Sequence, residues 1–329
     1  MMRPFYSHQK KHTNGRRPFV GREGRRPGAH AHGAPSGGQE AERRFYAGTA
    51  IDPSPRIRLE DGSTELTMRA MDLLCPIGMG QRGLIVAPPG SGKTTFLKHL
   101  CQATAKSRPG MKLYCLLIDE RPEEVTDFRR AVPAEVRWSS SDESYDHHIR
   151  TAQELMTQVY GEAGGGADVM VLIDSLTRLA RVHNAERSSS GRTLSGGVDA
   201  RALEVPRRIF GSARKIENGG SLTVLATILV DTGSRMDQVI FEEFKGTGNM
   251  EIYLSREISN QRIFPAIDIS KSGTRKEELL IEAGELEPIR KIRRVLSDFK
   301  PVDAAKALIE QLQKYPTNRD LLAALFKKD

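Results

Sequence analysis

A glycine-rich segment that ends in Lys and Thr carries the clearest chemistry in the chain: APPGSGKTT, Ala87–Thr95. It fits the phosphate-binding loop pattern, with Ala87 in place of the usual first glycine. In such a loop the backbone N–H groups turn toward phosphate oxygens, the Lys93 ammonium reaches the β- and γ-phosphates, and the Thr94 hydroxyl coordinates Mg²⁺. The segment predicts a nucleotide site with these contact residues: Pro89, Gly90, Ser91, Gly92, Lys93, Thr94 and Thr95.

A carboxylate at the end of an apolar run supplies the second part of such a site. DVMVLID, residues 168–174, ends in Asp174. A strand that ends in Asp suits the carboxylate that holds Mg²⁺ through water. Many buried strands end in Asp, so the interpretation depends on the phosphate loop upstream.

A second acidic segment, LLIDERPEEV, follows another apolar run. Glu120 lies just past the end of this run, where a carboxylate could orient or deprotonate an attacking water. On spacing alone the segment also fits a solvated acidic turn paired with Arg121, and three other carboxylates compete with Glu120: Asp119, Glu123 and Glu124.

Phosphoryl transfer also requires positive charge on the transition state beyond that of Lys93. A cation supplied by a neighbouring subunit would require an oligomer. Sequence spacing does not choose among five candidates: Arg178, Arg181, Arg256, Arg262 and Arg275.

Two glycine-bearing segments follow predicted strands: GRTLSGGVD, Gly191–Asp199, and DTGSRMD, Asp231–Asp237. Each has one Arg and small hydroxyl residues. Loops at the carboxyl ends of strands suit contacts to a ligand in a shared channel, although ordinary surface loops have the same composition.

The apolar runs indicate the elements that position these residues. Four runs rich in Val, Ile and Leu show little alternation, as in strands buried on both faces of a parallel sheet. They alternate with helical segments such as Thr94–Lys106 and Ser144–Tyr160, which predicts a doubly wound α/β fold. The four runs are residues 83–87, 113–119, 168–174 and 221–230. Helices are also predicted for Val302–Tyr315 and from Thr317, with Asp320 as a capping residue.

Composition separates a basic tail from the rest of the 329-residue chain. Met1–Arg44 holds ten of the 50 Lys and Arg and three of the 42 acids, so it carries most of the net charge of +8. Its Gly, Arg, His and Pro content predicts disorder. Phosphate neutralisation by such a tail, with Phe5, Tyr6 and Phe19 stacking on bases, would suit a nucleic acid. The predicted domains are therefore a tail, 1–44, and an α/β domain, 45–329.

Other classes are disfavoured by composition. No run approaches the roughly 18 apolar residues that a membrane span needs, and the N-terminus lacks the apolar core of a secretory signal. Three scattered cysteines fit neither a disulfide framework nor a zinc site, which indicates the cytoplasm.

Taken together, the motifs closely resemble one family, the bacterial transcription termination factor Rho. The resemblance covers about Phe45 to Leu280 and is thinner toward the C-terminus. It implies a RecA-like P-loop NTPase domain with a mostly parallel central sheet and a small C-terminal helical segment. The matching segments, in the family's order, are GQRGLIVAPPGSGKT, LLIDERPEEVT, IDSLTRLAR, LSGGVDA, DTGSRMD, EEFKGTGNME, RIFPAID and SGTRKEELL.

The resemblance also implies roles for single residues. Glu120 would be the catalytic carboxylate, and Arg275 would reach the ATP of the neighbouring subunit. Arg262 would be a second basic residue at that interface, Arg121 would help to sense the γ-phosphate, and Phe264 would pack on adenine. Lys93, Thr94 and Asp174 would bind the phosphates and Mg²⁺. Residues near RNA would be Arg192, Thr193, Ser195, Gly196, Gly197, Arg235 and Lys245.

The implied activity is that of an RNA-dependent ATPase and helicase: a homohexamer that hydrolyses ATP and moves on single-stranded RNA, acting with RNA polymerase in transcription termination. Gly90, Arg192 and Arg235 stand where the family often has Lys. The 44 residues before Phe45 are too few for the family's RNA-capturing OB-fold, so we expect the tail to replace it. Other interpretations are a nucleotide-gated RNA-binding ring without motor activity, an adaptor of a full-length Rho, and a rotary-type ATPase subunit without RNA, which the two loop matches disfavour.

Overall fold

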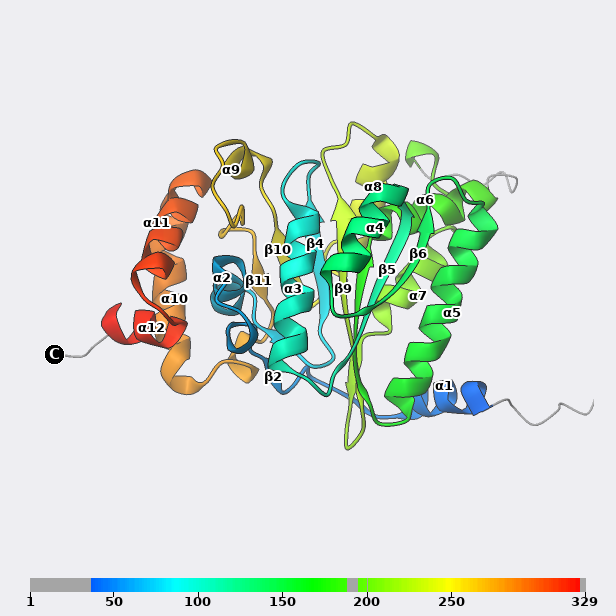
Figure 1. Ribbon diagram of the computed structural model, residues 1–329, viewed down its shortest axis with the longest axis horizontal. Coiled ribbons are helices and arrows are strands. Elements are labelled where there is room, and N and C mark those ends of the chain that lie inside the picture. Colours follow the sequence, from blue (N-terminus) through cyan, green and yellow to red (C-terminus); the bar gives the residue numbers. More distant parts are fainter. Residues whose placement is uncertain (1–36, 188–194, 200, 326–329) are drawn as a thin grey trace, which may run out of the picture. The chain divides into compact units, whose positions relative to one another are not determined.

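The apolar runs form the centre of a nine-stranded, mostly parallel sheet in the computed structural model, which describes residues 37–187, 195–199 and 201–325 (Figure 1). Neighbouring strands follow the order β11-β10-β4-β9-β7-β5-β6, and β8 joins β9 and β1. The strands from β10 to β6 are parallel, whereas β11, β8 and β1 pair antiparallel. The bounds are β1 Ala50–Ile51, β4 Arg82–Ala87, β5 Lys112–Glu120, β6 Glu135–Ser140, β7 Asp168–Asp174, β8 Arg214–Ile216, β9 Ser221–Leu229, β10 Met250–Tyr253 and β11 Gly273–Thr274, with β2 Arg56–Ile57 and β3 Ile77–Gly78 in a separate pair.

Two hydrophobic cores cover the two faces of this sheet, which explains why the strands appear in the sequence as continuous apolar runs. In β5, for example, Cys115 and Leu117 belong to one core, and Leu116 and Ile118 to the other. The first core includes residues of α2, α3, α4 and α10 to α12, and the second includes α1 and α5 to α8. The predicted doubly wound α/β fold is confirmed.

The helices include each of those that the sequence predicted. Asp320 N donates to the Thr317 hydroxyl at 3.0 Å, which confirms the predicted cap. The α-helices are α1 Gly37–Ala47, α2 Leu66–Leu74, α3 Lys93–Ser107, α4 Pro122–Ala131, α5 Tyr145–Gly164, α6 Leu176–Arg187, α7 Glu204–Gly211, α8 Arg235–Phe244, α9 Arg256–Asn260, α10 Ala283–Ser297, α11 Pro301–Lys314 and α12 Asn318–Leu325; short 3₁₀ turns are η1 Glu60–Gly62, η2 Ser195–Gly197 and η3 Glu277–Leu279.

Helix α1 differs from the sequence prediction, which assigned residues 37–44 to an irregular tail. The helix crosses the end of α5 (Figure 1), and its Phe45 ring is fully buried and stacks on Tyr160 at 5.3 Å between ring centroids. The Arg214 guanidinium lies 5.1 Å from the Phe45 ring centroid. The composition of the tail hid this helix because its stability comes from tertiary packing rather than from helix propensity. Residues 1–36 of the predicted tail lie outside the described residues.

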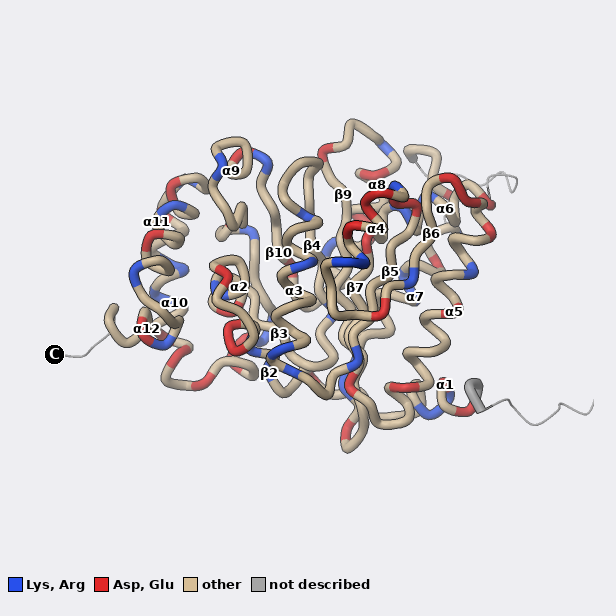
Figure 2. Tube along the Cα trace, viewed as in Figure 1, with Lys and Arg blue, Asp and Glu red and all other residues tan. Residues whose placement is uncertain are grey.

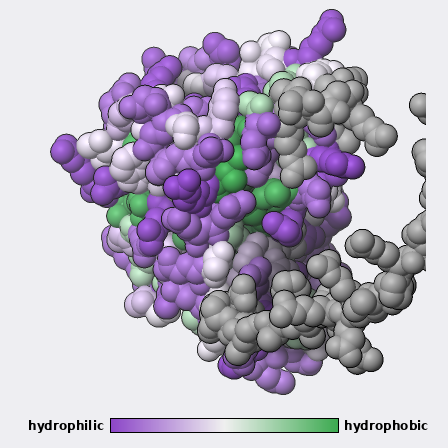
Figure 3. Space-filling model, turned by 90° about the vertical axis from the view of Figure 1, so that its right-hand side faces the viewer, coloured by the Kyte–Doolittle hydropathy of each residue, from purple (hydrophilic) through white to green (hydrophobic). Residues whose placement is uncertain are grey.

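Basic residues (Lys and Arg) and acidic residues (Asp and Glu) are interspersed over the described chain, and neither kind gathers in one part of the view in Figure 2. The face at the α5 end is mostly hydrophilic, with a small group of hydrophobic residues near its centre (Figure 3). Within the part of the chain that the structure describes, no helix is long and apolar enough to span a bilayer.

The contact between α1 and α5 predicts opposite effects for two glycines. A Cβ on Gly164 would lie 2.2 Å from the backbone oxygen of Ala41, whereas a Cβ on Gly161 would lie 3.8 Å from the Ala41 Cβ. We expect Gly164→Ala to displace α1 and cost about 1–3 kcal/mol of the free energy of unfolding, with faster proteolysis of residues 37–47. Gly161→Ala, the matched control, should be neutral or stabilise by up to about 1 kcal/mol. Thermal unfolding and limited proteolysis would measure both, and equal behaviour of the two variants would contradict this packing.

Candidate functional site

The predicted phosphate loop connects β4 to α3 at the carboxyl edge of the sheet. Gly90 and Gly92 have φ of +77° and +88°, a left-handed conformation that favours glycine. The Ser91 hydroxyl donates to Pro88 O at 2.7 Å, which closes the turn from inside and leaves the backbone of the loop to face a ligand. This is the strand–loop–helix geometry in which a helix N-terminus holds phosphate.

The parallel strands bring the predicted basic and acidic residues together at this edge. Lys93 Nζ lies 2.5 and 2.6 Å from the two carboxylate oxygens of Asp174 and 3.4 Å from Glu120 Oε1. Asp174 and Glu120 are buried, with 4% and 3% of their surface exposed. Burial disfavours the charge of Lys93, but the two carboxylates outweigh it and raise the pKa of the ammonium.

A bulge in β5 aims Glu120 at this cluster. The register against β6 shifts between Ile118 and Glu120, and Asp119 between them has φ of +57°. Side chains alternate along a regular strand, so without the bulge Glu120 would share the face of Ile118, away from the side of Asp174. Of the acidic residues that competed on spacing, the structure therefore brings Glu120 to Lys93.

The Glu120 carboxyl has a pKa that is raised toward neutral pH. Burial raises its pKa to about 7, while Lys93 and Arg178 favour its ionised form and Asp174 opposes it. Arg178 Nη2 lies 3.3 Å from Glu120 Oε2. A carboxyl with this pKa can accept or return a proton near neutral pH.

The aromatic side chain of Phe264 lies beside the phosphate loop. A Cβ on Gly92 would lie 3.5 Å from Cε1 of Phe264, a residue that is 48% exposed. Phe264 and Thr95 line a cavity of about 380 Å³ together with the loop glycines and the first turn of α2. The cavity can accept a flat ring stacked on Phe264.

Arg262 and Arg275, the two arginines that the family resemblance assigns to the subunit interface, lie at opposite edges of the sheet. Arg262 follows α9, whose Ser259 hydroxyl contacts Gly90 O at 3.3 Å, so it lies on the phosphate-loop side. Arg275 follows β11, and its backbone N–H donates to Asn249 O at the amino end of β10. Because β10 runs parallel to β4, Arg275 lies at the far edge and is exposed there.

Two further predicted residues occupy different surroundings. Arg121 is 70% exposed and pairs with Glu124 at 3.3 Å, outside the Lys93 cluster. Lys245 directly follows α8, and Arg275 Nη2 donates to the carbonyl of the next residue, Gly246, at 3.5 Å. The Lys245 side chain itself pairs with Glu242 at 3.8 Å and lies over the Phe241 ring.

Helix α6 connects the nucleotide cluster with the 231–237 loop. Its first turn carries Arg178, which pairs with Glu120. One turn later Arg181 Nε donates to Asp237 Oδ1 at 2.7 Å, and Arg181 Nη2 pairs with Oδ2. Asp237 is 2% exposed and lies in the first turn of α8, whose first residue, Arg235, is exposed.

The same helix fixes the second glycine-bearing loop. Asn184 Nδ2 donates to Gly197 O at 3.0 Å, and its Oδ1 accepts from Asp199 N at 2.7 Å. A Cβ on Gly196 would lie 3.1 Å from Arg235 O, so the two loops lie side by side. Arg192 and Thr193 lie outside the described residues, and Ser195 is described by its backbone in η2.

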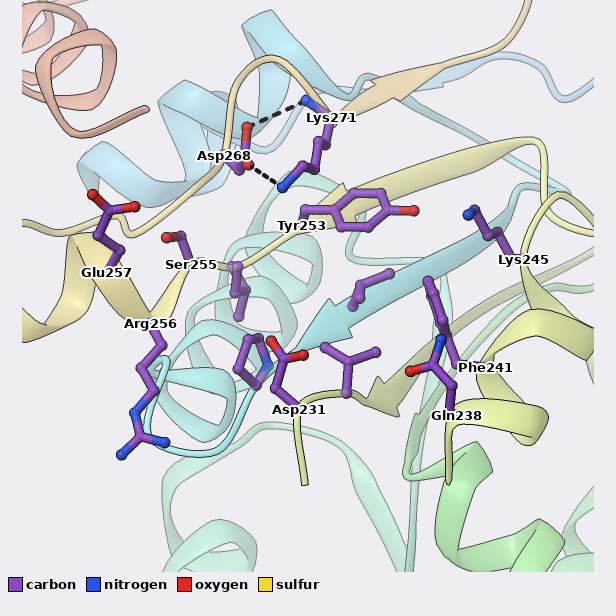
Figure 4. Close-up of a pocket in the computed structure, with 14 residues that line it drawn as sticks. Asp231, Gln238, Phe241, Lys245, Tyr253, Ser255, Arg256, Glu257, Asp268 and Lys271 are labelled. Carbon is purple, nitrogen blue, oxygen red and sulfur yellow. Dashed lines mark hydrogen bonds and ion pairs between the residues drawn. The ribbon is translucent and has the colours of Figure 1, made fainter. Parts of the chain in front are cut away.

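A larger cavity of about 660 Å³ lies on the α8 side of the sheet (Figure 4). Figure 4 shows Asp231, the first residue of the 231–237 loop, Lys245 and Tyr253 on different sides of this cavity. The Asp268 carboxylate, paired with Lys271 at 3.0 Å, closes one side. The cavity adjoins both Pro88 of the phosphate loop and the predicted RNA-facing residues.

Two residues of the cluster are not identified by sequence reasoning. Arg178 is one of five arginines that spacing does not separate. Thr227 has no motif around it, although a hydroxyl residue four positions after Thr223 in an apolar strand is a detectable signal, since both face the same side. Thr227 Oγ1 donates to Asp174 Oδ1 at 2.7 Å.

The charges around Glu120 predict its titration. In carboxyl-carbon NMR, compared with Glu120→Gln for assignment, the Glu120 carboxyl should titrate near 7. Arg178→Met removes a cation that favours the carboxylate, so the pKa should rise further. Arg121→Met, the control, removes an exposed cation paired with Glu124 and should leave the Glu120 midpoint in place. An ordinary midpoint near 4.3 in the wild type would show that Glu120 is solvated rather than buried.

Comparison with known proteins agrees with this geometry. Residues 67–274 match the ATP synthase alpha/beta family, nucleotide-binding domain. The chain is 50% identical over 280 residues to transcription termination factor Rho of Haemophilus influenzae, covering 84% of this chain and 67% of that protein. It is 49% identical to Rho of Aquifex aeolicus, covering 86% and 65%.

Among solved structures, the fold is similar to that of an ATPase from the type III secretion system of pathogenic bacteria, with a TM-score of 0.69, 23% identity, and coverage of 84% of this chain and 85% of the other. The chain spans about two thirds of the length of the curated relatives it matches. It belongs to the ATP synthase alpha/beta family of nucleotide-binding domains and, within it, to the transcription termination factor Rho family of ATP hydrolases.

Proposed function

We propose that this chain hydrolyses ATP at the subunit interfaces of a homohexameric ring and couples hydrolysis to movement on single-stranded RNA. The observation that carries the proposal is helix α6, which contacts the buried Glu120 at one end and both glycine-bearing loops further along. A rigid helix between the two regions gives each loop a direct mechanical connection to the nucleotide. Family membership supports the same interpretation.

In this proposal the phosphate loop and Lys93 hold the triphosphate. Lys93 exchanges its contacts with Asp174 and Glu120 for contacts with the β- and γ-phosphates, which replace the negative charge that it loses. Thr94, at the start of α3, and Asp174 offer the hydroxyl and carboxylate oxygens that Mg²⁺ prefers. The ion would neutralise charge on the phosphates.

Glu120 orients the attacking water and accepts its proton. It is released from Lys93 when that ammonium turns to the phosphates, while Arg178 keeps it in place. Phe264 stacks on the adenine in the adjoining cavity, and Arg121 and Arg262 contribute charge at the surface of the site.

Arg275 acts on the ATP of the neighbouring subunit. It lies at the edge of the sheet opposite its own phosphate loop, so it serves a nucleotide bound by another chain. The cations nearest the loop are already paired, Lys93 with two carboxylates and Arg178 with Glu120. A cation supplied in trans completes the charge on the transition state.

The two loops form the RNA grip. Gly196, Gly197 and Arg235 lie together on the surface, and Arg192, Thr193 and Ser195 come shortly before the two glycines in the sequence. Lys245 adds charge on the rim of the larger cavity. Transcription termination with RNA polymerase, or assembly with a full-length Rho, would be the cellular setting. The other candidate is a nucleotide-gated RNA-binding ring or adaptor without motor activity, which the same loops would serve.

RNA-stimulated ATP turnover tests the proposal and separates the two candidates. We expect single-stranded RNA to raise turnover at least about tenfold, because α6 transmits loop contacts to Glu120. Deletion of residues 2–36, which leaves α1 intact, reports what the basic tail contributes. Lys93→Ala should abolish ATP turnover both in the full chain and in the chain with residues 2–36 deleted. Slow hydrolysis that RNA does not change would favour the non-motor ring.

Subunit mixing tests the role of Arg275. Arg275→Ala and Lys93→Ala should each be inactive alone. Mixed in equal amounts within rings, they restore intact interfaces at about one quarter of positions, because Lys93 and Arg275 of one interface come from different chains. Recovered turnover of the mixture would support a residue acting in trans. Its complete absence, with mixed rings verified by mass spectrometry, would show that both residues serve the same chain.

A further inference from the structure

We propose that Thr227 is a positioning residue for the Mg²⁺ carboxylate: its hydroxyl fixes the orientation of Asp174. The inference rests on the proposed function, in which Asp174 holds the ion. It assigns a task to a side chain that neither the phosphate-loop motif nor the acidic motifs contain.

The sheet places Thr227 between the two strands that build the nucleotide site. Strand β9 pairs with β4, where Thr227 lies opposite Ile85, and with β7, where Ala226 lies opposite Ile173. The Thr227 side chain is fully buried, and its hydroxyl donates to Asp174 Oδ1 at 2.7 Å. Its other neighbour is Ile173 O at 3.3 Å, a longer contact.

This hydroxyl becomes more important when nucleotide binds. Lys93 holds both oxygens of Asp174 in this structure. Once Lys93 turns to the phosphates, the carboxylate loses those contacts and can rotate. The Thr227 hydrogen bond then keeps Oδ1 occupied and presents Oδ2 in one direction. Hydrogen bonds of this kind orient ligand carboxylates, and their removal typically weakens metal binding by about 10- to 100-fold.

The position of Thr227 is itself held by the start of α6. Two residues later, Leu229 N donates to Thr177 Oγ1 at 2.8 Å, and Thr177 is fully buried. Thr177 lies three residues after Asp174, so the hydrogen bond ties the end of β9 to the chain that leaves β7. The Thr227 hydroxyl and the Asp174 carboxylate are therefore fixed relative to each other before any ligand binds.

Metal affinity is the direct test. Mn²⁺ binding would be measured by electron paramagnetic resonance on the full chain with a slowly hydrolysed ATP analogue. Thr227→Val keeps the shape but removes the hydroxyl, and Thr227→Ser keeps the hydroxyl. The matched control is Thr223→Val on the same strand, whose equally buried hydroxyl accepts from Gly80 N at 2.9 Å, near the opposite edge of the sheet.

We expect Thr227→Val to weaken Mn²⁺ binding about 10- to 100-fold, Thr227→Ser to stay within about threefold, and Thr223→Val to match the wild type. Binding of the analogue without metal should not change. If Thr227→Val cannot be purified folded, Thr227→Ala and Thr227→Ser make the same comparison, because both lack the γ-methyl and Ser alone has the hydroxyl.

Wild-type Mn²⁺ affinity in Thr227→Val overturns the proposal, and so does equal weakening in Thr223→Val, which would indicate general destabilisation. Absence of nucleotide-dependent Mn²⁺ binding in the wild type would instead overturn the proposed function. The two failures are distinguishable because the wild type is measured first.

Discussion

The arrangement of the site depends on one ammonium group shared by two buried carboxylates. Lys93 neutralises Asp174 and approaches Glu120 where water is largely excluded. Two carboxylates so close together could not both be charged without a cation between them. In the proposed function the same ammonium binds the triphosphate, so nucleotide binding would change the partners of all three residues at once.

This constraint explains why the neighbouring contacts are so specific. Arg178 supports Glu120 and Thr227 supports Asp174, so each carboxylate keeps one partner that does not depend on Lys93. A buried polar group that loses its hydrogen bond costs more than the bond itself contributes. Partners that remain when Lys93 moves therefore preserve the geometry of the site through the exchange.

The loops gain their connection to the site through the helix that follows Asp174. Arg178, Arg181 and Asn184 recur at intervals of three along α6, so they lie on a shared side of the helix. Their partners belong to β5, the 231–237 loop and the 195–199 segment. In the proposed function this one helix would pass a shift of Glu120 to both loops, and Arg275, at the opposite edge of the sheet, would serve the neighbouring subunit.

Local sequence signals were sufficient to predict the fold class, the phosphate loop and the acidic partner Asp174. Long apolar runs and a glycine-rich motif are such signals, because burial on both faces requires strands without alternation. Strands β6 and β10 were not predicted, because β6 is a half-exposed edge strand and β10 has four residues. Helix α1 was missed because Phe45 is stabilised by Tyr160 and Arg214, which are distant in sequence.

Strand register and packing resolved what spacing left open. Sequence spacing does not distinguish Glu120 from the three other carboxylates, Asp119, Glu123 and Glu124. A one-residue bulge in β5 turns Glu120 toward Lys93. The candidate arginines separate for the same reason: Arg178 reaches Glu120, Arg181 holds Asp237, and Arg275 lies at the far edge. Motifs report residue types along one chain, whereas the direction of a side chain depends on strand register and on neighbours brought together by the sheet. Both of these are set when the chain folds.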